Sequence, residues 1–176
     1  QIGLGGMGQV WLAQQTQPVR REVALKLIKT GLTSKELVVR FEAERQVLAV
    51  MDHPSIAKVF DGGTTAYGEP YLVMEYVDGI AITDFCERNR LGLEERLQLF
   101  IHVCSAVQHA HQKGIIHRDL KPSNILVCRS NAEQAQPKVI DFGLAKVFQS
   151  QLLPIDQPNM THAGQVLGTP QYMSPE

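Results

Sequence analysis

Residues 117–124 of the chain have the sequence HRDLKPSN, in which one acid, Asp119, lies between two basic side chains. The apolar run ILV follows at 125–127, and the tripeptide DFG supplies a second acid, Asp141. The Asp141 carboxylate and the Asn124 amide offer hard oxygen ligands of the kind that Mg²⁺ prefers. Taken alone, an HRD tripeptide also fits a buried ion pair, so the segments around it have to decide.

A glycine-rich segment opens the chain. Residues 3–10, GLGGMGQV, follow the pattern G-x-G-x-x-G-x-V, whose bare backbone amides can close over phosphate oxygens. By themselves the glycines fit a flexible hairpin or a dinucleotide-binding loop equally well. A dinucleotide-binding fold needs a helix next, whereas residues 11–13 continue as a strand, so a hairpin is favoured.

A lysine and a glutamate stand out in apolar surroundings. Lys26 lies in the apolar run at 23–28, where an unpaired ammonium is costly to bury. Glu44 lies seven residues after Leu37 and four before Leu48, on the apolar face of a predicted helix. A pair between Lys26 and Glu44 explains both. The alternative is that Lys26 extends to solvent and Glu44 is surface charge.

These motifs, in this order, resemble those of eukaryotic-type (Hanks-type) Ser/Thr protein kinases. The tripeptides Gly-Thr-Pro at 168–170 and Ser-Pro-Glu at 174–176 add to the resemblance. The sequences KPSNIL at 121–126 and GTPQYMSPE at 168–176 resemble those of the bacterial branch of this family. Ser174 stands in place of the alanine that is usual in the A-P-E motif. The resemblance covers the whole chain. It implies an α+β, bilobal kinase fold, with a β-rich small lobe at 1–76 and the first part of a mainly helical large lobe at 77–176. Both ends look cut, so a fragment is expected.

The resemblance also implies transfer of the γ-phosphoryl group of Mg-ATP to Ser or Thr hydroxyls of proteins. Such transfer depends on positioning and charge neutralisation. The implied catalytic residues are Asp119, Lys121, Lys26, Glu44, Asn124, Asp141 and Thr169, with Asn124 and Asp141 holding Mg²⁺. The implied nucleotide-binding residues are Ile2, Gly3, Gly5, Gly8, Val10, Ala24, Lys26, Met74, Glu75, Val77 and Leu126.

Further roles follow from the same resemblance. Thr169 corresponds to the residue that bonds the catalytic Asp and Lys in Ser/Thr kinases. An apolar spine is expected from Leu48, Val59, His117 and Phe142, which makes a structural, non-titrating His117 preferable to a general base. In the predicted loop 149–164, Thr161 is the expected autophosphorylation site, with Ser150 as the weaker candidate.

Two other classes of protein share part of this pattern. A pseudokinase normally lacks one of Lys26, Asp119 or Asp141, and all three are present. A small-molecule kinase shares the aspartates but does not need the peptide platform expected at 168–176. Protein substrates are therefore favoured.

Composition narrows the partners and the compartment. The 176 residues are 44% hydrophobic, which suits a globular core. The net charge of −1 gives no positive electrostatic field that would attract nucleic acid. Three dispersed cysteines indicate neither a disulfide framework nor a zinc site, and the longest uncharged stretch, 97–112, carries three His. We expect a cytoplasmic protein, or the cytoplasmic domain of a kinase anchored elsewhere, without membrane contact here. A dimer of kinase domains for autophosphorylation is a further expectation.

Local patterns predict the elements. Strands are expected at 9–13, 23–28, 56–60 and 71–76, and a helix from the capping box of Thr33 and Glu36 to Met51. Thr83 is expected to cap a short helix. A longer helix, closed by Gly114, is expected to bury Leu97, Ile101, Cys104 and Val107. Residues 129–137 are polar and predict a loop.

Overall fold

The computed structural model describes residues 1–5, 8–28, 51–130, 134–142 and 169–172. The chain separates into two compact units. The first unit consists of Gln1–Asp52 and Ala57–Val77, and the second consists of His53–Ile56 and Asp78–Glu176. The helix predicted from Thr33, including Glu44 and Leu48, lies outside the described residues, as does the predicted loop 149–164. Met51 is described, and its side chain is buried.

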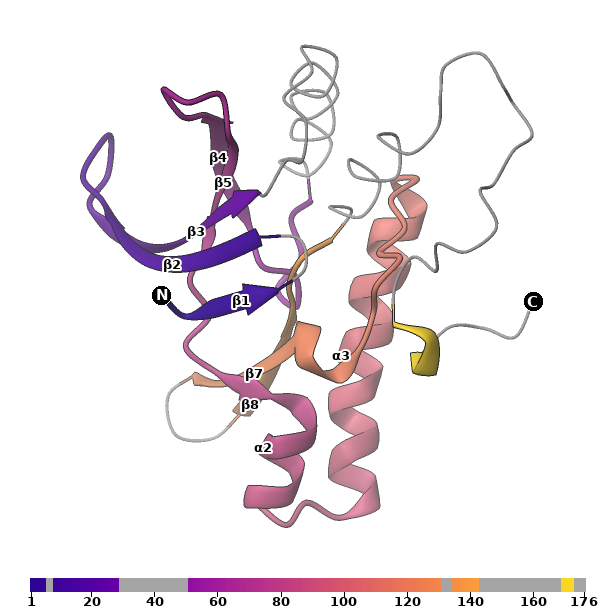
Figure 1. The fold of residues 1–176 in the computed structure, drawn as a ribbon. Helices are drawn as coiled ribbons and strands as arrows, with labels where there is room; N and C mark the ends of the chain where they lie inside the picture. Colours follow the sequence, from indigo (N-terminus) through magenta and orange to yellow (C-terminus); the bar gives the residue numbers. More distant parts are fainter. Residues whose placement is uncertain (6–7, 29–50, 131–133, 143–168, 173–176) are drawn as a thin grey trace. The chain divides into compact units, whose positions relative to one another are not determined.

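The first unit contains a five-stranded antiparallel sheet, drawn from indigo to magenta in Figure 1. Its strands are β1 (Gly3–Gly5), β2 (Gly8–Gln15), β3 (Arg21–Ile28), β4 (Val59–Thr64) and β5 (Pro70–Glu75), in the order β1-β2-β3-β5-β4. Three of the predicted strands are confirmed. The prediction for 56–60 is wrong in its bounds, because Ile56 instead forms a parallel bridge with Val139 in the second unit. The strand runs on through Gly62 and Gly63, which have low strand propensity and concealed it.

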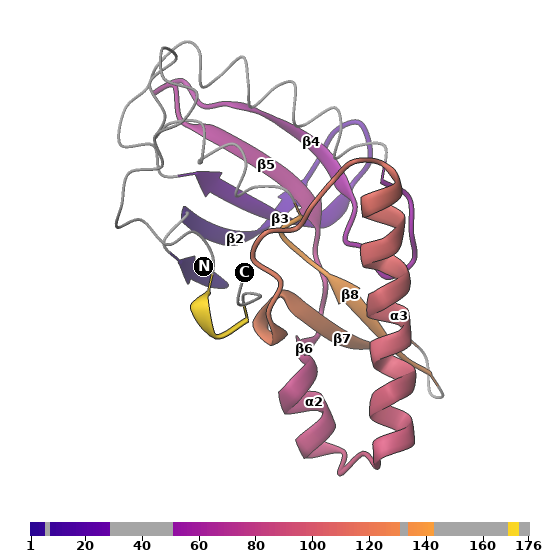
Figure 2. The same cartoon turned by 90° about the vertical axis from the view of Figure 1, so that its right-hand side faces the viewer.

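The second unit combines two helices with a small sheet, in the order β6-β7-β8. Its elements are β6 (Ile80–Ala81), α2 (Ile82–Arg88), α3 (Leu93–Gln112), η1 (Pro122–Asn124), β7 (Ile125–Ser130), β8 (Gln134–Val139) and η2 (Pro170–Tyr172). Strand β8 packs against α3 (Figure 2). No helix among the described residues is long and apolar enough to cross a bilayer.

Two local predictions in this unit are wrong. Residues 129–137 are predicted to form a loop, but β7 and β8 pair as an antiparallel hairpin. Ile125 is opposite Val139 at one end of the pairing, and Ser130 is opposite Gln134 at the other. Backbone pairing with a neighbouring strand stabilises this hairpin despite its polar composition, and Pro137 within it is buried. Thr83 is not the cap of α2, because Ala81 occupies that position and no side chain caps the helix.

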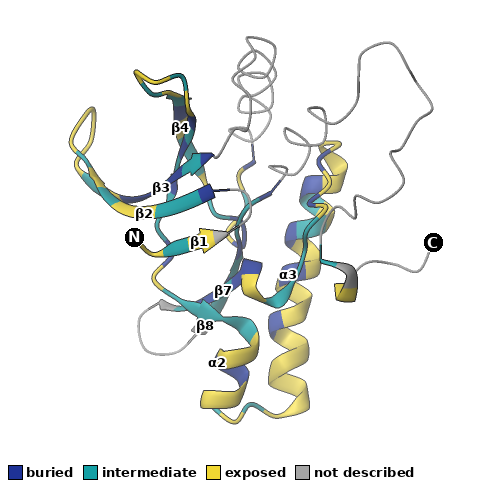
Figure 3. Cartoon of the chain, viewed as in Figure 1, coloured by how far each residue is buried: buried dark blue, intermediate teal, exposed yellow. Residues whose placement is uncertain are grey.

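The buried face of α3 also differs from the expectation. Leu99, Val103, Ala106 and Ala110 are buried. By contrast, Leu97 and Ile101 are 51% and 56% exposed, Cys104 is exposed and Val107 is only half-buried. The helix carries apolar residues on more than one side. Figure 3 shows that buried and exposed residues alternate along it. Of these buried residues, Leu99 packs in a cluster with Phe85 and Cys86 of α2 and Val127 of β7.

The end of α3 is as predicted. Gly114 adopts φ 73°, a left-handed conformation that favours glycine. Its N–H donates to the His111 carbonyl oxygen at 2.9 Å, and the Ile115 N–H donates to that of Ala110 at 3.0 Å. These bonds satisfy carbonyls of the last turn and direct the chain towards residues 117–124.

Candidate active site

In the first unit, strand register gathers four of the predicted nucleotide-binding residues on one face of the sheet. Val10 is the cross-strand partner of Lys26, and Ala24 is that of Met74. Directly opposed residues and alternate residues along a strand share a face, so all four do. Lys26, Ala24 and Met74 are buried, while Val10 is half-buried. An ammonium therefore lies within an apolar surface, as the sequence indicated.

The glycine-rich segment meets β3 closely. Gly8 adopts φ 147°, and a Cβ there would overlap the Leu27 carbonyl oxygen. Only glycine fits, because a side chain would collide with backbone. Gly3 and Gly5 lie on β1, paired with Val10 and Gly8. The N–H of Ile2 donates to the Val10 carbonyl oxygen at 2.9 Å.

Glu75 and Val77, two of the predicted nucleotide-binding residues, lie at the end of β5 and just after it. Val77 is buried and Glu75 is half-buried. The Glu75 N–H donates to the Lys58 carbonyl oxygen at 2.8 Å, and its carboxylate accepts from the Lys58 N–H at 3.2 Å. The Glu75 N–H is thus committed to the protein itself. Leu126, also predicted to contact the nucleotide, lies half-buried on β7 in the second unit.

In the second unit, four predicted catalytic residues form one hydrogen-bonded group around Asp119. The Thr169 hydroxyl donates to Asp119 Oδ1 at 2.8 Å, and Lys121 Nζ lies 2.8 Å from Asp119 Oδ2. Lys121 Nζ also donates to Thr169 Oγ1 at 3.1 Å. The Asn124 amide nitrogen donates to the Asp119 carbonyl oxygen at 2.8 Å and approaches Oδ2 at 3.4 Å. Both oxygens of Asp119 are therefore held in a fixed orientation.

These donors set the charge of Asp119. Its partial burial would raise the pKa of the carboxyl group, but hydrogen bonds from Lys121, Thr169 and Asn124, with the charge of Lys121, outweigh burial and lower it. Asp119 is thus ionised at neutral pH and can accept hydrogen bonds from a hydroxyl group.

His117 is a buried neighbour of this group and contacts Asp119 and Phe142. It is 3% exposed, its ring lies 4.7 Å from that of Phe142, and its Nε2 donates to the Ile140 carbonyl oxygen at 2.9 Å. Its Nδ1 accepts from the Asp119 N–H at 3.3 Å, which specifies the neutral tautomer. Burial lowers its pKa, and the bond to Ile140 offsets only part of that effect. The expected structural role fits this geometry. Of the other expected spine members, Leu48 is undescribed and Val59 belongs to the first unit.

The two predicted metal ligands are brought together by backbone. The Ile140 N–H donates to the Asn124 carbonyl oxygen at 2.9 Å, which holds the residue before Asp141 beside Asn124. Asn124 is buried, and because its amide nitrogen faces Asp119, its amide oxygen is turned the other way. An amide oxygen and a carboxylate suit Mg²⁺, so the residues present fit this ion.

Two residues near the site have unusual backbone conformations. Arg118 and Asp141 adopt φ 66° and 64°, in the left-handed region that costs about 1–3 kcal/mol for a residue other than glycine. Neither conformation was predicted, nor was the part played by the Ile140 carbonyl oxygen. A backbone group leaves no mark in residue identity, so no pattern could have revealed them.

Comparison with known proteins identifies the family of the chain. Residues 1–176 match the protein kinase domain family, and the chain belongs to that family. It is 38% identical to the serine/threonine-protein kinase PknB of Mycobacterium leprae and 39% identical to Pkn1 of Myxococcus xanthus. Each match covers 99% of this chain, but only 27% and 24% of those relatives. The expected resemblance to bacterial Ser/Thr kinases is confirmed.

Solved structures show the same fold. The PknI kinase domain of Mycobacterium tuberculosis superimposes with a TM-score of 0.67 at 31% identity, covering 81% of this chain and 57% of that one. The expected α+β kinase-like fold is therefore confirmed. The chain spans about a quarter of the length of these curated relatives.

Proposed function

We propose that this chain transfers the γ-phosphoryl group of ATP, with Mg²⁺, to serine and threonine hydroxyls of proteins. The observation that carries the proposal is the group formed by Asp119, Lys121, Thr169 and Asn124. A carboxylate held by a threonine hydroxyl and a lysine suits a hydroxyl acceptor that must be oriented and partly deprotonated. The names of the relatives support serine and threonine as acceptors.

Each residue has a role in this proposal. Asp119 accepts a hydrogen bond from the incoming hydroxyl, and its ionised state allows it to take the proton as the phosphorus–oxygen bond forms. Lys121 stabilises negative charge on the transferred group, and Thr169 keeps Asp119 oriented. Asn124 and Asp141 hold Mg²⁺, which when bound neutralises phosphate charge.

The first unit supplies nucleotide binding. We assign the α- and β-phosphates to Lys26, with Glu44 as its partner, and to the backbone amides of the glycine-rich segment. For the adenine we propose Val10, Ala24, Met74 and Val77. Leu126, in the second unit, is proposed as a further nucleotide-binding residue. ATP as substrate also supports the expected cytoplasmic location. A pair of kinase domains is proposed for autophosphorylation.

The proposal is tested by incubating the full-length protein with Mg-ATP and three acceptor sets. These are a Ser/Thr peptide library, a matched Tyr library, and small alcohols such as choline and an aminoglycoside. We expect transfer to the Ser/Thr library only, abolished by Asp141→Ala. Transfer to the small alcohols alone would instead support a small-molecule kinase. Nucleotide binding without any transfer would indicate a pseudokinase.

A further inference from the structure

Residues 53–56 are attached to β8, although the residues on both sides of them belong to the first unit. The Val139 N–H donates to the Ser55 carbonyl oxygen at 2.9 Å, and Ile56 forms the bridge with Val139. The Gln136 amide nitrogen donates to the Pro54 carbonyl oxygen at 3.3 Å. Ser55 and Ile56 are 2% and 1% exposed. We call residues 53–56 the 53–56 segment.

His53 attaches the same segment to α3. Its Nδ1 accepts a hydrogen bond from the Ser55 N–H at 3.1 Å, and its Nε2 lies 3.2 Å from Ser105 Oγ. Since Nδ1 is an acceptor, Nε2 carries the proton and donates to Ser105. The geometry thus requires a neutral ring. A proton on Nδ1 removes the acceptor of the buried Ser55 amide.

The groups that surround His53 also oppose a second proton. The His109 ring lies 5.3 Å from that of His53, and its Nε2 is buried without a hydrogen-bond partner among the described residues. Burial is the main cause that lowers the pKa of His53, followed by the charges of His109 and His102 from α3. From β8 the segment accepts hydrogen bonds from the neutral Gln136 amide and the Val139 backbone N–H. On its own side, Asp52 is paired with Lys58 at 2.7 Å.

We propose that His53 is a pH-sensitive attachment, whose protonation breaks the Ser55–His53 hydrogen bond within the 53–56 segment and so weakens the packing of the segment on α3 and β8. The direction follows from linkage. The released segment binds a proton with the ordinary pKa of histidine, about 6.5, while the attached one binds it only at lower pH. The attachment is therefore fully formed above that pH and weakens as pH falls. This property does not depend on phosphoryl transfer.

The test is hydrogen exchange, followed by mass spectrometry, on the complete chain from about pH 7.5 to about pH 5.5. Protection factors correct for the pH dependence of the chemical exchange rate. For peptides that contain Ser55 and Val139, we expect protection to fall by up to about tenfold per pH unit below about 6.5. A peptide from α2 serves as an internal reference and should show no such loss.

Variants separate His53 from other titrating groups. In His53→Asn the amide oxygen can replace Nδ1 as acceptor but does not titrate, so protection should persist in acid. His109→Gln removes one opposing charge and should make the loss of protection smaller. His111→Gln, an exposed position on the same helix, should behave like the wild type.

Two results would overturn the proposal. One is constant protection of the Ser55 peptide across the pH range, and the other is an equal loss in His53→Asn, which would point to His117 or to global unfolding. If His53→Asn does not fold, Ser105→Ala provides the second test. It removes the Nε2 partner but leaves Nδ1 in place, so protection should be lower throughout and still fall in acid. A pH-independent Ser105→Ala variant contradicts the proposal.

Discussion

The Thr169 hydroxyl donates a 2.8 Å hydrogen bond to Asp119 Oδ1 across 50 residues of sequence. Thr169 in turn accepts a hydrogen bond from Lys121, so one small side chain orients both the Asp119 carboxylate and the Lys121 ammonium group. The hydroxyl group, rather than the bulk of the side chain, is what this geometry uses.

Replacement of Thr169 separates these two properties. Thr169→Val keeps the shape but removes the hydroxyl, and we expect kcat for phosphoryl transfer to fall by about tenfold to a hundredfold, since a hydrogen bond to a charged group is worth about 1.5–3 kcal/mol. Thr169→Ser should stay within a few-fold of the wild type. Steady-state kinetics on a Ser/Thr peptide provides the measurement, and equal losses in both variants would mean that shape matters more.

Lys26 allows a matched comparison with a surface lysine. We expect Lys26→Met to reduce phosphoryl transfer by about a hundredfold or more, because it removes a positive charge aimed at phosphate. Lys58→Met, on an exposed ion pair with Asp52, should retain activity. Both variants should melt near the wild-type temperature. An active Lys26→Met enzyme would remove Lys26 from the proposed site.

His117 offers a test of a buried hydrogen bond and of its pH dependence. His117→Phe retains the packing on Phe142 but leaves the Ile140 carbonyl oxygen without its donor, which should cost about 1–3 kcal/mol in urea unfolding. Because burial lowers the pKa of His117, the wild type loses stability as pH falls below about 6.5, so the difference should shrink in acid. A difference that grows in acid would contradict a neutral His117.

The two faces of α3 predict opposite outcomes for the same substitution. Leu99, 5% exposed, packs with Phe85 and Val127, so Leu99→Ala should cost about 2–5 kcal/mol. Leu97→Ala, at a position that is 51% exposed, should change stability by less than about 0.5 kcal/mol. Thermal and urea unfolding of the complete protein measure both. A large loss in Leu97→Ala would show that the exposed face is covered there.

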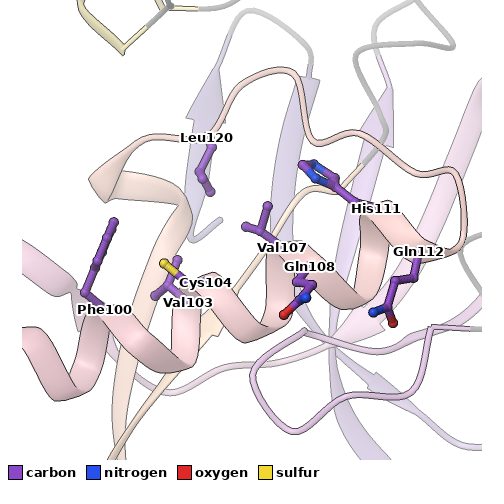
Figure 4. A pocket seen from close by; sticks show the side chains of 8 residues that line it. All are labelled: Phe100, Val103, Cys104, Val107, Gln108, His111, Gln112 and Leu120. Atoms are coloured by element: carbon purple, nitrogen blue, oxygen red, sulfur yellow. The ribbon is translucent and has the colours of Figure 1, made fainter.

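That exposed face borders a groove of about 560 Å³, lined among others by Phe100, Cys104, Val107 and Leu120. Figure 4 shows the Leu120 side chain directed towards those of α3. The groove is therefore lined both by residues of α3 and by Leu120, the residue that follows Asp119 in the sequence.

Thr161 remains a prediction, because it lies outside the described residues. We expect mass spectrometry after incubation with Mg-ATP to find phosphate on Thr161, with Ser150 as the weaker position, since a phosphate in this loop can pair with an arginine such as Arg118. Thr161→Ala should lower activity, while Asp141→Ala should prevent the modification. An active enzyme without phosphate at 149–164 would exclude this site.

Much of the candidate site could be predicted because its residues are close in sequence. Asp119, Lys121 and Asn124 lie within six positions, and a short segment that bears them leaves few ways to arrange them. Lys26 was also predictable, since a charge in an apolar strand demands an explanation. Thr169 required the family resemblance, because spacing alone does not reveal a contact across 50 residues.

Other features could not be read from the sequence. Helix α3 carries apolar side chains at Leu97 and Ile101 and also at Leu99 and Val103, so periodicity cannot choose the packed side. The β7–β8 hairpin is polar and is defined by backbone pairing that composition does not report. The contact of His53 with Ser105 spans 52 positions and has no local signature.

The 53–56 segment has a consequence for anyone who exchanges parts between related kinases. The chain passes from one unit to the other at 52/53, 56/57 and 77/78, so no single cut separates the two. A chimera joined at residue 77 would bring a foreign 53–56 segment to native Ser105, Gln136 and Val139. Compatible junctions must therefore transplant these four residues together with the second unit, although they precede β4 in the sequence.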